Sequence, residues 1–378
     1  MTDIIIAGDL CPKDRVASLF EDSRYSEVLI EVKPIVENVD YSIVNLEAPI
    51  VRGEGSPIPK SGPNLKCAPN VVGAIQYAGF KGVTLANNHF RDYGDEGAQT
   101  TINELEKANL DYVGAGKGPS NAARILYKEI GGQTFAFINC CEHEFSVTTG
   151  EQQVGSNGLD VINQYHAILE AKIMAQYVIV IVHGGIEMYQ LPTPRMVQTY
   201  RFFIEAGADA VVNHHQHCYS GYEYYHEKPI VYGLGNFCFD WKGKTNDIWF
   251  NGYMAQLFFN DGNVSFMPIP YRQCDDTPAV RLSVVDKPLF EQRIQELCSI
   301  ISDEKLLAAE YEKFLQTTWK NYDLISPYAN RYVNWLYKKG VLPSIMPKKK
   351  IYGILNAIRC ESQQERLLDA LNKKLKIS

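Results

Sequence analysis

The sequence predicts a mixed α/β protein in which two packed sheets are sandwiched between helices. Strand-length apolar runs alternate with helical patterns through the first half of the chain, which is typical of parallel βαβ units. Further along, Gly131-Gly132 and Asp261-Gly262 each separate two apolar runs, as in antiparallel hairpins. Beyond about residue 280 only helical patterns remain. We therefore expect a sandwich domain over residues 1–280 and a helical C-terminal extension over residues 281–378.

The first half supplies the parallel strands and the helices that connect them. Short apolar runs predict the strands, and apolar residues at helical spacing predict the helices. The expected strands are 4–8, 41–46, 82–86 and 112–113, and the expected helices are 28–39, 71–78 and 95–108.

The middle of the chain supplies the second set of strands. Residues 177–182 form a very apolar run, which places that strand at the centre of a sheet. The other expected strands are 125–130, 134–139, 210–212, 221–225, 230–232, 253–260 and 264–268, with helices at 162–174 and 196–206.

The C-terminal extension is helical and basic. Helices are expected at 290–301, 305–319 and 328–337, followed by apolar faces at Ile351, Ile354, Leu355 and Ile358 and at Leu367, Leu371 and Leu375. Residues 342–378 hold eight Lys or Arg and three Asp or Glu. The plainer interpretation is a solvated helical cap. The alternative is a surface that binds a protein partner or a membrane.

Composition excludes several classes of protein. A net charge of −7 argues against general nucleic-acid binding. The nine cysteines are odd in number and show no Cys-x-x-Cys spacing, so neither a structural zinc site nor a disulfide framework is predicted. No signal peptide or transmembrane segment is evident, and we expect a cytoplasmic protein.

Polar side chains that could bind a ligand or a metal, or transfer a proton, follow several of the predicted strands. In open α/β sheets, ligands bind at the carboxyl ends of the strands. The residues concerned are Asp9, Glu47, Asn88, His89, Asp92, His183, Glu187, His214, His215, His217 and Asn236. Each feature alone has a structural explanation, since Asn and Asp favour turns and caps and a lone His is often a satisfied core residue.

Taken together, these residues predict a metal site. Five of the eight histidines lie at strand ends that should share one edge of the sheets. Carboxylate, amide and imidazole donors suit Mn²⁺, Fe²⁺ or Zn²⁺ in a site of one or two ions. His89 would stand beside the metal as the acid that protonates a leaving group. Arg91, next to His89, favours an anionic substrate.

The strand-end motifs resemble those of the poly-γ-glutamate capsule synthesis protein family, the CapA family, over about residues 3–240. The motifs are Gly8-Asp9, Asn45-Leu46-Glu47, Ala86-Asn87-Asn88-His89 with Asp92 and Gly94, Gly114-Ala115-Gly116, His183-Gly184-Gly185 with Glu187, Gly207-Ala208-Asp209, His214 to His217, and Gly233-Leu234-Gly235-Asn236-Phe237.

That family is similar in turn to the calcineurin-type metallophosphoesterases, and the resemblance implies their four-layer α/β/β/α sandwich. It also implies roles for individual residues. His89 becomes the catalytic imidazole, and Asp92 either orients it or is a turn residue. Glu187, His214, Asn236 and Arg91 are left as substrate-contacting or supporting residues, and His214 has no equally clear role. The implied metal ligands are Asp9, Glu47, Asn88, His183, His215 and His217.

Two positions depart from the phosphoesterase pattern. Cys11 stands where those enzymes usually have a ligand histidine, and Glu47 stands where they have an aspartate. A small buried residue is the preferred interpretation of Cys11, and a thiolate ligand is the alternative.

Two functions follow. The first is a metal-dependent hydrolase of phosphoester or γ-glutamyl amide bonds, linked to capsule, poly-γ-glutamate or polysaccharide biosynthesis. The alternative is a non-catalytic accessory module that binds or transfers an anionic capsular polymer, which the departure at Cys11 and the tyrosines between Tyr219 and Tyr232 favour.

Overall fold

The computed structural model describes the chain except for residues 61, 319–327 and 360–378. The chain divides into two compact units, residues 1–307 and residues 308–378, which are described separately. The helix predicted around Leu367 to Leu375 lies outside the described residues.

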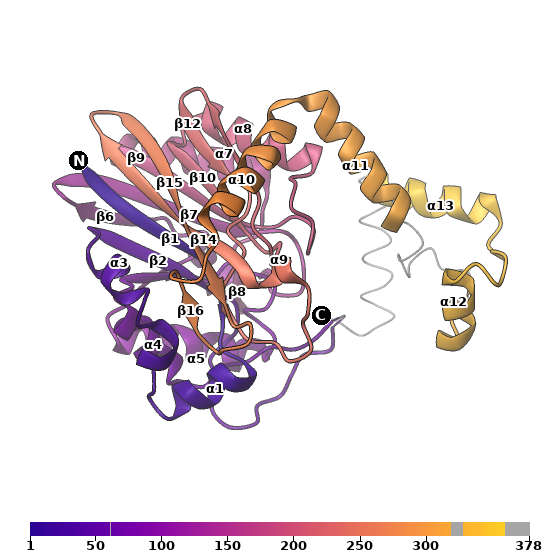
Figure 1. Cartoon of the computed structure of the whole chain (residues 1–378), viewed down its shortest axis with the longest axis horizontal. Coiled ribbons are helices and arrows are strands. Elements are labelled where there is room, and N and C mark those ends of the chain that lie inside the picture. The colour runs from indigo at the N-terminus through magenta and orange to yellow at the C-terminus, as the bar shows by residue number, and fades with distance from the viewer. Residues whose placement is uncertain (61, 319–327, 360–378) are drawn as a thin grey trace. The chain divides into compact units, whose positions relative to one another are not determined.

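The first sheet combines parallel strands from the N-terminal region with an antiparallel hairpin from residues 251–273 (Figure 1). Its order is β16-β15-β14-β1-β2-β3-β4, and β13 pairs in parallel with the end of β1. The strands are β1 (Thr2–Cys11), β2 (Tyr41–Leu46), β3 (Gly82–Thr84), β4 (Asp111–Val113), β13 (Asn236–Phe239), β14 (Asn251–Asn260), β15 (Asn263–Gln273) and β16 (Val280–Arg281).

The second sheet has the order β11-β12-β10-β9-β7-β6 and places the very apolar strand β9 in its interior, as the sequence predicted. β7, β9, β10 and β12 run parallel. The strands are β6 (Leu126–Ile130), β7 (Gln133–Cys141), β9 (Tyr177–His183), β10 (Ala210–His214), β11 (Tyr222–Tyr225) and β12 (Lys228–Val231). A separate ribbon pairs β5 (Ala115–Lys117) with β8 (Val154–Ser156).

Side-chain alternation along β1 shows how the sheets pack. Ile4 and Ile6 belong to the core shared with the second sheet, whereas Ile5 and Ala7 belong to the core beneath the N-terminal helices. Successive side chains of a strand point to opposite faces, so an apolar run without polar positions fits a strand covered on both sides.

Helices cover the outer faces of both sheets (Figure 1). The first sheet is covered by α1 (Asp14–Glu21), α2 (Ser26–Leu29), α3 (Lys33–Glu37), α4 (Val71–Ala78) and α5 (Gly94–Lys107). The second is covered by α7 (Val161–Met174) and α8 (Pro194–Ala206). α6 (Gly118–Ala122) and α9 (Asp247–Phe250) are short connectors, and α10 (Lys287–Ser302) packs Phe290 and Leu297 into the shared core. The predicted α/β/β/α sandwich is therefore confirmed.

The prediction of one continuous helix over residues 28–39 is wrong. Residues 28–39 form two short helices, α2 and α3, with a turn between them. Pro34 lies in the first turn of α3, where its missing N–H costs nothing. Within a continuous helix the same proline would lack a hydrogen bond and its ring would clash with the carbonyl of Ile30, so the helix breaks before it.

The second unit contains the remaining helices. α11 (Glu304–Thr318) leads into it, and α12 (Arg331–Lys338) and α13 (Lys348–Arg359) follow. Among the described residues, no helix combines the length and the apolar composition needed to cross a bilayer.

Aromatic side chains fill the space between the sheets. The Phe137 ring of β7 lies 5.3 Å from the Tyr41 ring of β2, and the Phe259 ring of β14 lies 4.9 Å from that of Phe135. These contacts join strands that are distant in sequence and fix the spacing of the two sheets.

We expect Phe137→Ala to lower the free energy of unfolding by about 3–5 kcal/mol, because it removes a fully buried ring between two sheets. Urea unfolding followed by circular dichroism measures the change. Phe145→Ala is the control, since Phe145 is 41% exposed and should cost little. A cost for Phe137→Ala no larger than that of the control would contradict the sandwich packing.

Candidate metal centre

The carboxyl ends of strands from both sheets meet at one site. In the first sheet, Asp9 of β1 lies beside Asn45 of β2 and Asn236 of β13. In the second sheet, His183 of β9 lies beside His214 of β10. All six predicted ligands are buried, with at most 6% of any of them exposed: Asp9, Glu47, Asn88, His183, His215 and His217.

Glu47 lies at the centre of this group. It follows β2 directly and is fully buried, and neither of its carboxylate oxygens has a hydrogen-bond partner. It belongs to two sets of possible ligands, one with His183 and His215 and one with Asp9 and His217. Within each set the ligand atoms lie within 4.8 Å of one another. The arrangement therefore matches two neighbouring ion positions that share one carboxylate.

The orientation of His217 is set by Asn236. The Asn236 amide nitrogen donates to the backbone carbonyls of His217 and Trp249, so its Oδ1 accepts a hydrogen bond from His217 Nδ1 at 2.9 Å. In the neutral imidazole this leaves Nε2 as the acceptor, and Nε2 lies 3.8 Å from Glu47 Oε1. Two acceptors facing each other fit a cation between them, and a partner on the other ring nitrogen is the usual support of a metal-binding histidine.

The second set of ligands is closely packed. His183 Nε2 lies 3.5 Å from Glu47 Oε1, 3.1 Å from His215 Nδ1 and 3.0 Å from Asn88 Oδ1. The structure thus brings Asn88 beside the histidines, as predicted. His215 and His217 both adopt positive φ angles, 90° and 53°. Non-glycine residues hold such conformations only where the surroundings enforce them, which is common at functional sites.

Burial and neighbouring charges set the protonation of these groups. Burial, followed by the neighbouring His215, lowers the pKa of His183 well below its usual range. Burial, followed by His217, lowers the pKa of His215 to about 4. Both imidazoles are therefore neutral at pH 7, which is the form that binds metals.

The pKa values of the Asp9 and Glu47 carboxylates shift in opposite directions. Burial would raise the pKa of Asp9, but its interactions with His217, His183 and His214 together outweigh burial and lower the pKa below the usual range. Asp9 also accepts a hydrogen bond from the Asn45 amide at 2.7 Å. Burial, then the Asp9 charge, raises the pKa of Glu47 well above its usual range. A bound cation would reverse this last shift, because it stabilises the ionised carboxylate.

His89 lies beside this centre with a different set of partners. Its Nδ1 is 2.6 Å from Asp92 Oδ2, and both side chains are buried. The Lys60 ammonium forms a buried ion pair with Asp92 Oδ1 and lies 3.1 Å from His89 Nδ1. Burial lowers the pKa of His89, with Asp92 opposing the shift. Asp92 is thus placed to orient the imidazole through Nδ1.

The four residues predicted as substrate-contacting or supporting lie in different settings. Asn236 orients His217, and His214 Nε2 contacts the backbone carbonyl of Ala7 at 2.9 Å, which ties β10 to β1. The Arg91 guanidinium pairs at 2.7 Å with Asp95 in the first turn of α5, so its charge is already balanced. Glu187 is exposed but close enough to contribute to the raised pKa of Glu47.

Sequence reasoning missed two charged residues near the site. Lys60 comes from a loop without a periodic pattern, and only its contacts in space reveal it. Glu144 lies in another loop, with its carboxylate 3.8 Å from His215 Nε2. Burial, followed by Glu187, raises the pKa of Glu144.

Cys11 lies in the core beneath the N-terminal helices and is in neither ligand set. Burial, followed by the Glu47 charge, raises the pKa of its thiol well above the usual range. This environment keeps the thiol neutral, in line with the preferred interpretation of a small buried residue.

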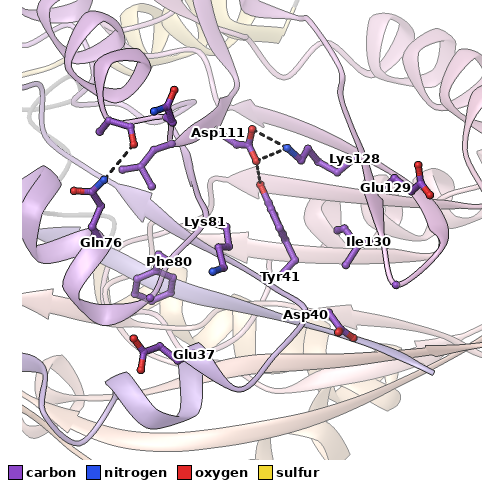
Figure 2. A pocket seen from close by; sticks show the side chains of 15 residues that line it. Glu37, Asp40, Tyr41, Gln76, Phe80, Lys81, Asp111, Lys128, Glu129 and Ile130 are labelled. Carbon is purple, nitrogen blue, oxygen red and sulfur yellow. Dashed lines mark hydrogen bonds and ion pairs between the residues drawn. The ribbon is translucent and has the colours of Figure 1, made fainter.

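A cavity of about 620 Å³ lies away from this site, at the amino ends of β2, β3 and β4 (Figure 2). Its central groups pair with one another: the Tyr41 hydroxyl and the Lys128 ammonium both donate to the Asp111 carboxylate. None of the predicted site residues lines it.

The fold and the site define an α/β/β/α sandwich protein with a histidine and carboxylate centre at one edge of its sheets. The chain belongs to the bacterial capsule synthesis protein family PGA_cap, which matches residues 3–241. The family resemblance predicted from the motifs is thereby confirmed.

Named relatives support this membership. Capsule biosynthesis protein CapA from Bacillus anthracis is 29% identical over 292 residues, which cover 75% of this chain and 70% of that protein. PGA biosynthesis protein CapA from Bacillus subtilis is 29% identical over 291 residues, 75% of this chain and 76% of that protein. A probable polyglutamine synthesis accessory protein from Mycobacterium tuberculosis is 27% identical over 273 residues, 64% of this chain and 69% of that protein.

Solved structures with similar topology are more distant. A putative 5′-nucleotidase from Staphylococcus aureus is 14% identical, with a TM-score of 0.47 and coverage of 78% of this chain and 58% of that one. A hypothetical protein from Thermus thermophilus is 13% identical, with a TM-score of 0.46 and coverage of 72% and 99%. The fold assignment therefore stands on the strand order and layers of the chain itself.

We expect protein purified without chelator to carry divalent metal, and Glu47→Gln to lose it from both positions. His217→Ala should lose metal from one position only, because His217 belongs to one ligand set and Glu47 to both. Elemental analysis by mass spectrometry gives the ratios, with the exposed His226 as the control in His226→Ala. Full metal content in Glu47→Gln would contradict the shared-carboxylate geometry.

The stability of the Glu47→Gln variant distinguishes a role of Glu47 in metal binding from a role in supporting the fold. In chelator, Glu47→Gln should unfold at the same temperature as the wild type or higher, since it removes a buried carboxylate without hydrogen-bond partners. With Mn²⁺ at about 100 times its Kd, only the wild type should gain about 2.7 kcal/mol. Calorimetry measures both, and a large loss of stability in chelator would indicate that Glu47 supports the fold instead.

Proposed function

We propose that this protein is a metal-dependent hydrolase that acts in capsule or poly-γ-glutamate metabolism. The observation that carries the proposal is the buried, unpartnered Glu47 carboxylate shared by two sets of histidine and carboxylate donors. Its donors fit Mn²⁺, Fe²⁺ or Zn²⁺, and the shared oxygen pair fits two adjacent ions. The link to capsule synthesis comes from the family and from the names of the relatives.

Divalent ions bound at these positions would supply Lewis-acid polarisation of a phosphoryl or carbonyl oxygen and activation of water. Asp9 and Glu47 provide the negative charge that balances the ions. Asn45 and Asn236 hold Asp9 and His217 in place through hydrogen bonds of 2.7 and 2.9 Å. The burial of all these groups excludes bulk water and strengthens the electrostatic interactions within the site.

Proton transfer at the leaving group is the task we assign to His89. Asp92 accepts from Nδ1, so Nε2 is the nitrogen that exchanges a proton with the substrate. Hydrolysis cleaves one P–O or C–N bond, adds a hydroxyl to phosphorus or carbon, and places a proton on the departing oxygen or nitrogen. Phosphoesters and γ-glutamyl amides both meet this description.

We expect His89→Ala to lower kcat by roughly 10²–10⁴-fold while the metal content stays unchanged, because His89 belongs to neither ligand set. Turnover is followed with p-nitrophenyl phosphate, bis-p-nitrophenyl phosphate and γ-glutamyl-p-nitroanilide in the presence of Mn²⁺. His226→Ala is the matched control at an exposed histidine. No turnover of any of the three substrates by metal-loaded wild type, or full activity in His89→Ala, would refute this mechanism.

A second function is a non-catalytic module that binds an anionic polymer. Two observations favour it: a relative is named as an accessory protein, and Cys11 stands where phosphoesterases usually have a ligand histidine. In this case purified poly-γ-glutamate should sediment with the protein and remain intact. Binding that survives Asp9→Ala with His183→Ala, without any cleavage, would replace the hydrolase with this function. Cleavage that both substitutions abolish would exclude it.

A further inference from the structure

The stretch from residue 328 to residue 359, which includes α12 and α13, carries charges of only one sign. Its basic residues are Arg331, Lys338, Lys339, Lys348, Lys349, Lys350 and Arg359, and it contains no Asp or Glu. The chain as a whole has a net charge of −7, so this basic stretch is a local feature and does not follow from the overall composition.

The same stretch exposes large apolar side chains. Tyr332 and Trp335, one helical turn apart on α12, are 80% and 57% exposed. Further exposed apolar residues follow in the connection to α13 and on α13 itself, namely Val341, Ile345, Ile351 and Ile358. Single exposed apolar residues are ordinary, but six within 27 residues mark an interaction surface.

The chemistry of this surface identifies its partner. Tyrosine and tryptophan favour the boundary between lipid headgroups and acyl chains, and lysines close to such a boundary are attracted to anionic headgroups. Because residues 328–359 contain no Asp or Glu, this stretch itself does not repel an anionic surface. α12 and α13 have 8 and 12 residues, far fewer than the roughly 20 that a spanning helix needs, so they would lie on the bilayer.

We propose that residues 328–359 form a docking surface for an anionic lipid bilayer, with Tyr332 and Trp335 as apolar anchors and Lys348, Lys349 and Lys350 as the principal electrostatic contacts. This proposal goes beyond the hydrolase function and does not depend on it. It places the chemistry of the first unit on a chain that is held at a membrane surface.

The test is co-sedimentation of the full chain with vesicles. One set contains equal parts of phosphatidylglycerol and phosphatidylcholine, and the other contains phosphatidylcholine alone. The wild type should bind the anionic vesicles and release them at high salt, because added ions screen the attraction. Binding to both sets with equal strength, or to neither, would overturn the proposal.

Two variants locate the surface. Lys348→Gln with Lys349→Gln and Lys350→Gln should weaken binding on the order of a hundredfold, as the loss of three charges near a membrane predicts. The matched control replaces three exposed lysines of the first unit, Lys81→Gln, Lys107→Gln and Lys287→Gln, and should bind as the wild type does. Equal losses in both variants would show that only net charge matters and would overturn the assignment.

Tyr332→Ser with Trp335→Ser tests the apolar anchors and should weaken binding at least about tenfold. Circular dichroism and thermal melting confirm that each variant is folded. A different outcome is that the full chain sediments with neither set of vesicles and binds a soluble acidic protein through these residues. That result would assign the surface to a protein partner and overturn the membrane proposal.

Discussion

The unpaired carboxylate of Glu47 is the constraint around which the site is organised. A buried ionised carboxylate without partners costs several kcal/mol, and proteins avoid that cost by protonation, by pairing or by metal binding. Here the nearest groups are the acceptor nitrogen of His217, the neutral His183 and the second carboxylate of Asp9. None of them donates a hydrogen bond to Glu47. A divalent cation would satisfy all of these groups at once, and by stabilising the ionised carboxylate it would oppose the raised pKa of Glu47.

The donor groups around Glu47 come from both sheets, so their spacing depends on a fixed relative position of the two sheets. Beyond the aromatic core, polar contacts join the sheets close to the site. His214 of β10 contacts the Ala7 carbonyl of β1, and Asn139 of β7 accepts from the Ala86 amide after β3 at 2.8 Å. His214, which the family resemblance left without a clear role, therefore belongs to the framework that sets the distance between the ligands.

The sequence predicted most of the fold because its signals are local. The strand β2 and the helix α4 begin and end where the apolar runs do, and the interior position of β9 follows from its continuous apolar character. The site was predictable where residues follow strands, because parallel strands bring their carboxyl ends to one edge. The contacts of Lys60 and the pairing of Arg91 with Asp95 were not predictable, because they depend on where loops and side chains turn in space.

Asp92 shows most clearly what the three-dimensional structure adds. On the sequence alone it was either the partner of His89 or a turn residue, and a turn residue would be satisfied by its near neighbours. The structure shows that it is both, because Asp92 lies in the turn before α5, its amide donates to the His89 carbonyl at 3.0 Å, and its carboxylate contacts His89 Nδ1. Further contacts come from Ile58, Lys60, Asn64 and Leu65. The Leu65 amide donates to Asp92 Oδ2 at 2.6 Å, and the Ile58 amide and the Asn64 side chain both donate to its backbone carbonyl. With the Lys60 ion pair, these contacts come from residues at least 27 positions away, so they hold Asp92 in addition to the local turn. They fix a carboxylate whose remaining contact is the imidazole of His89. The geometry of His89, to which we assign proton transfer, therefore depends on residues that carry no recognisable sequence pattern.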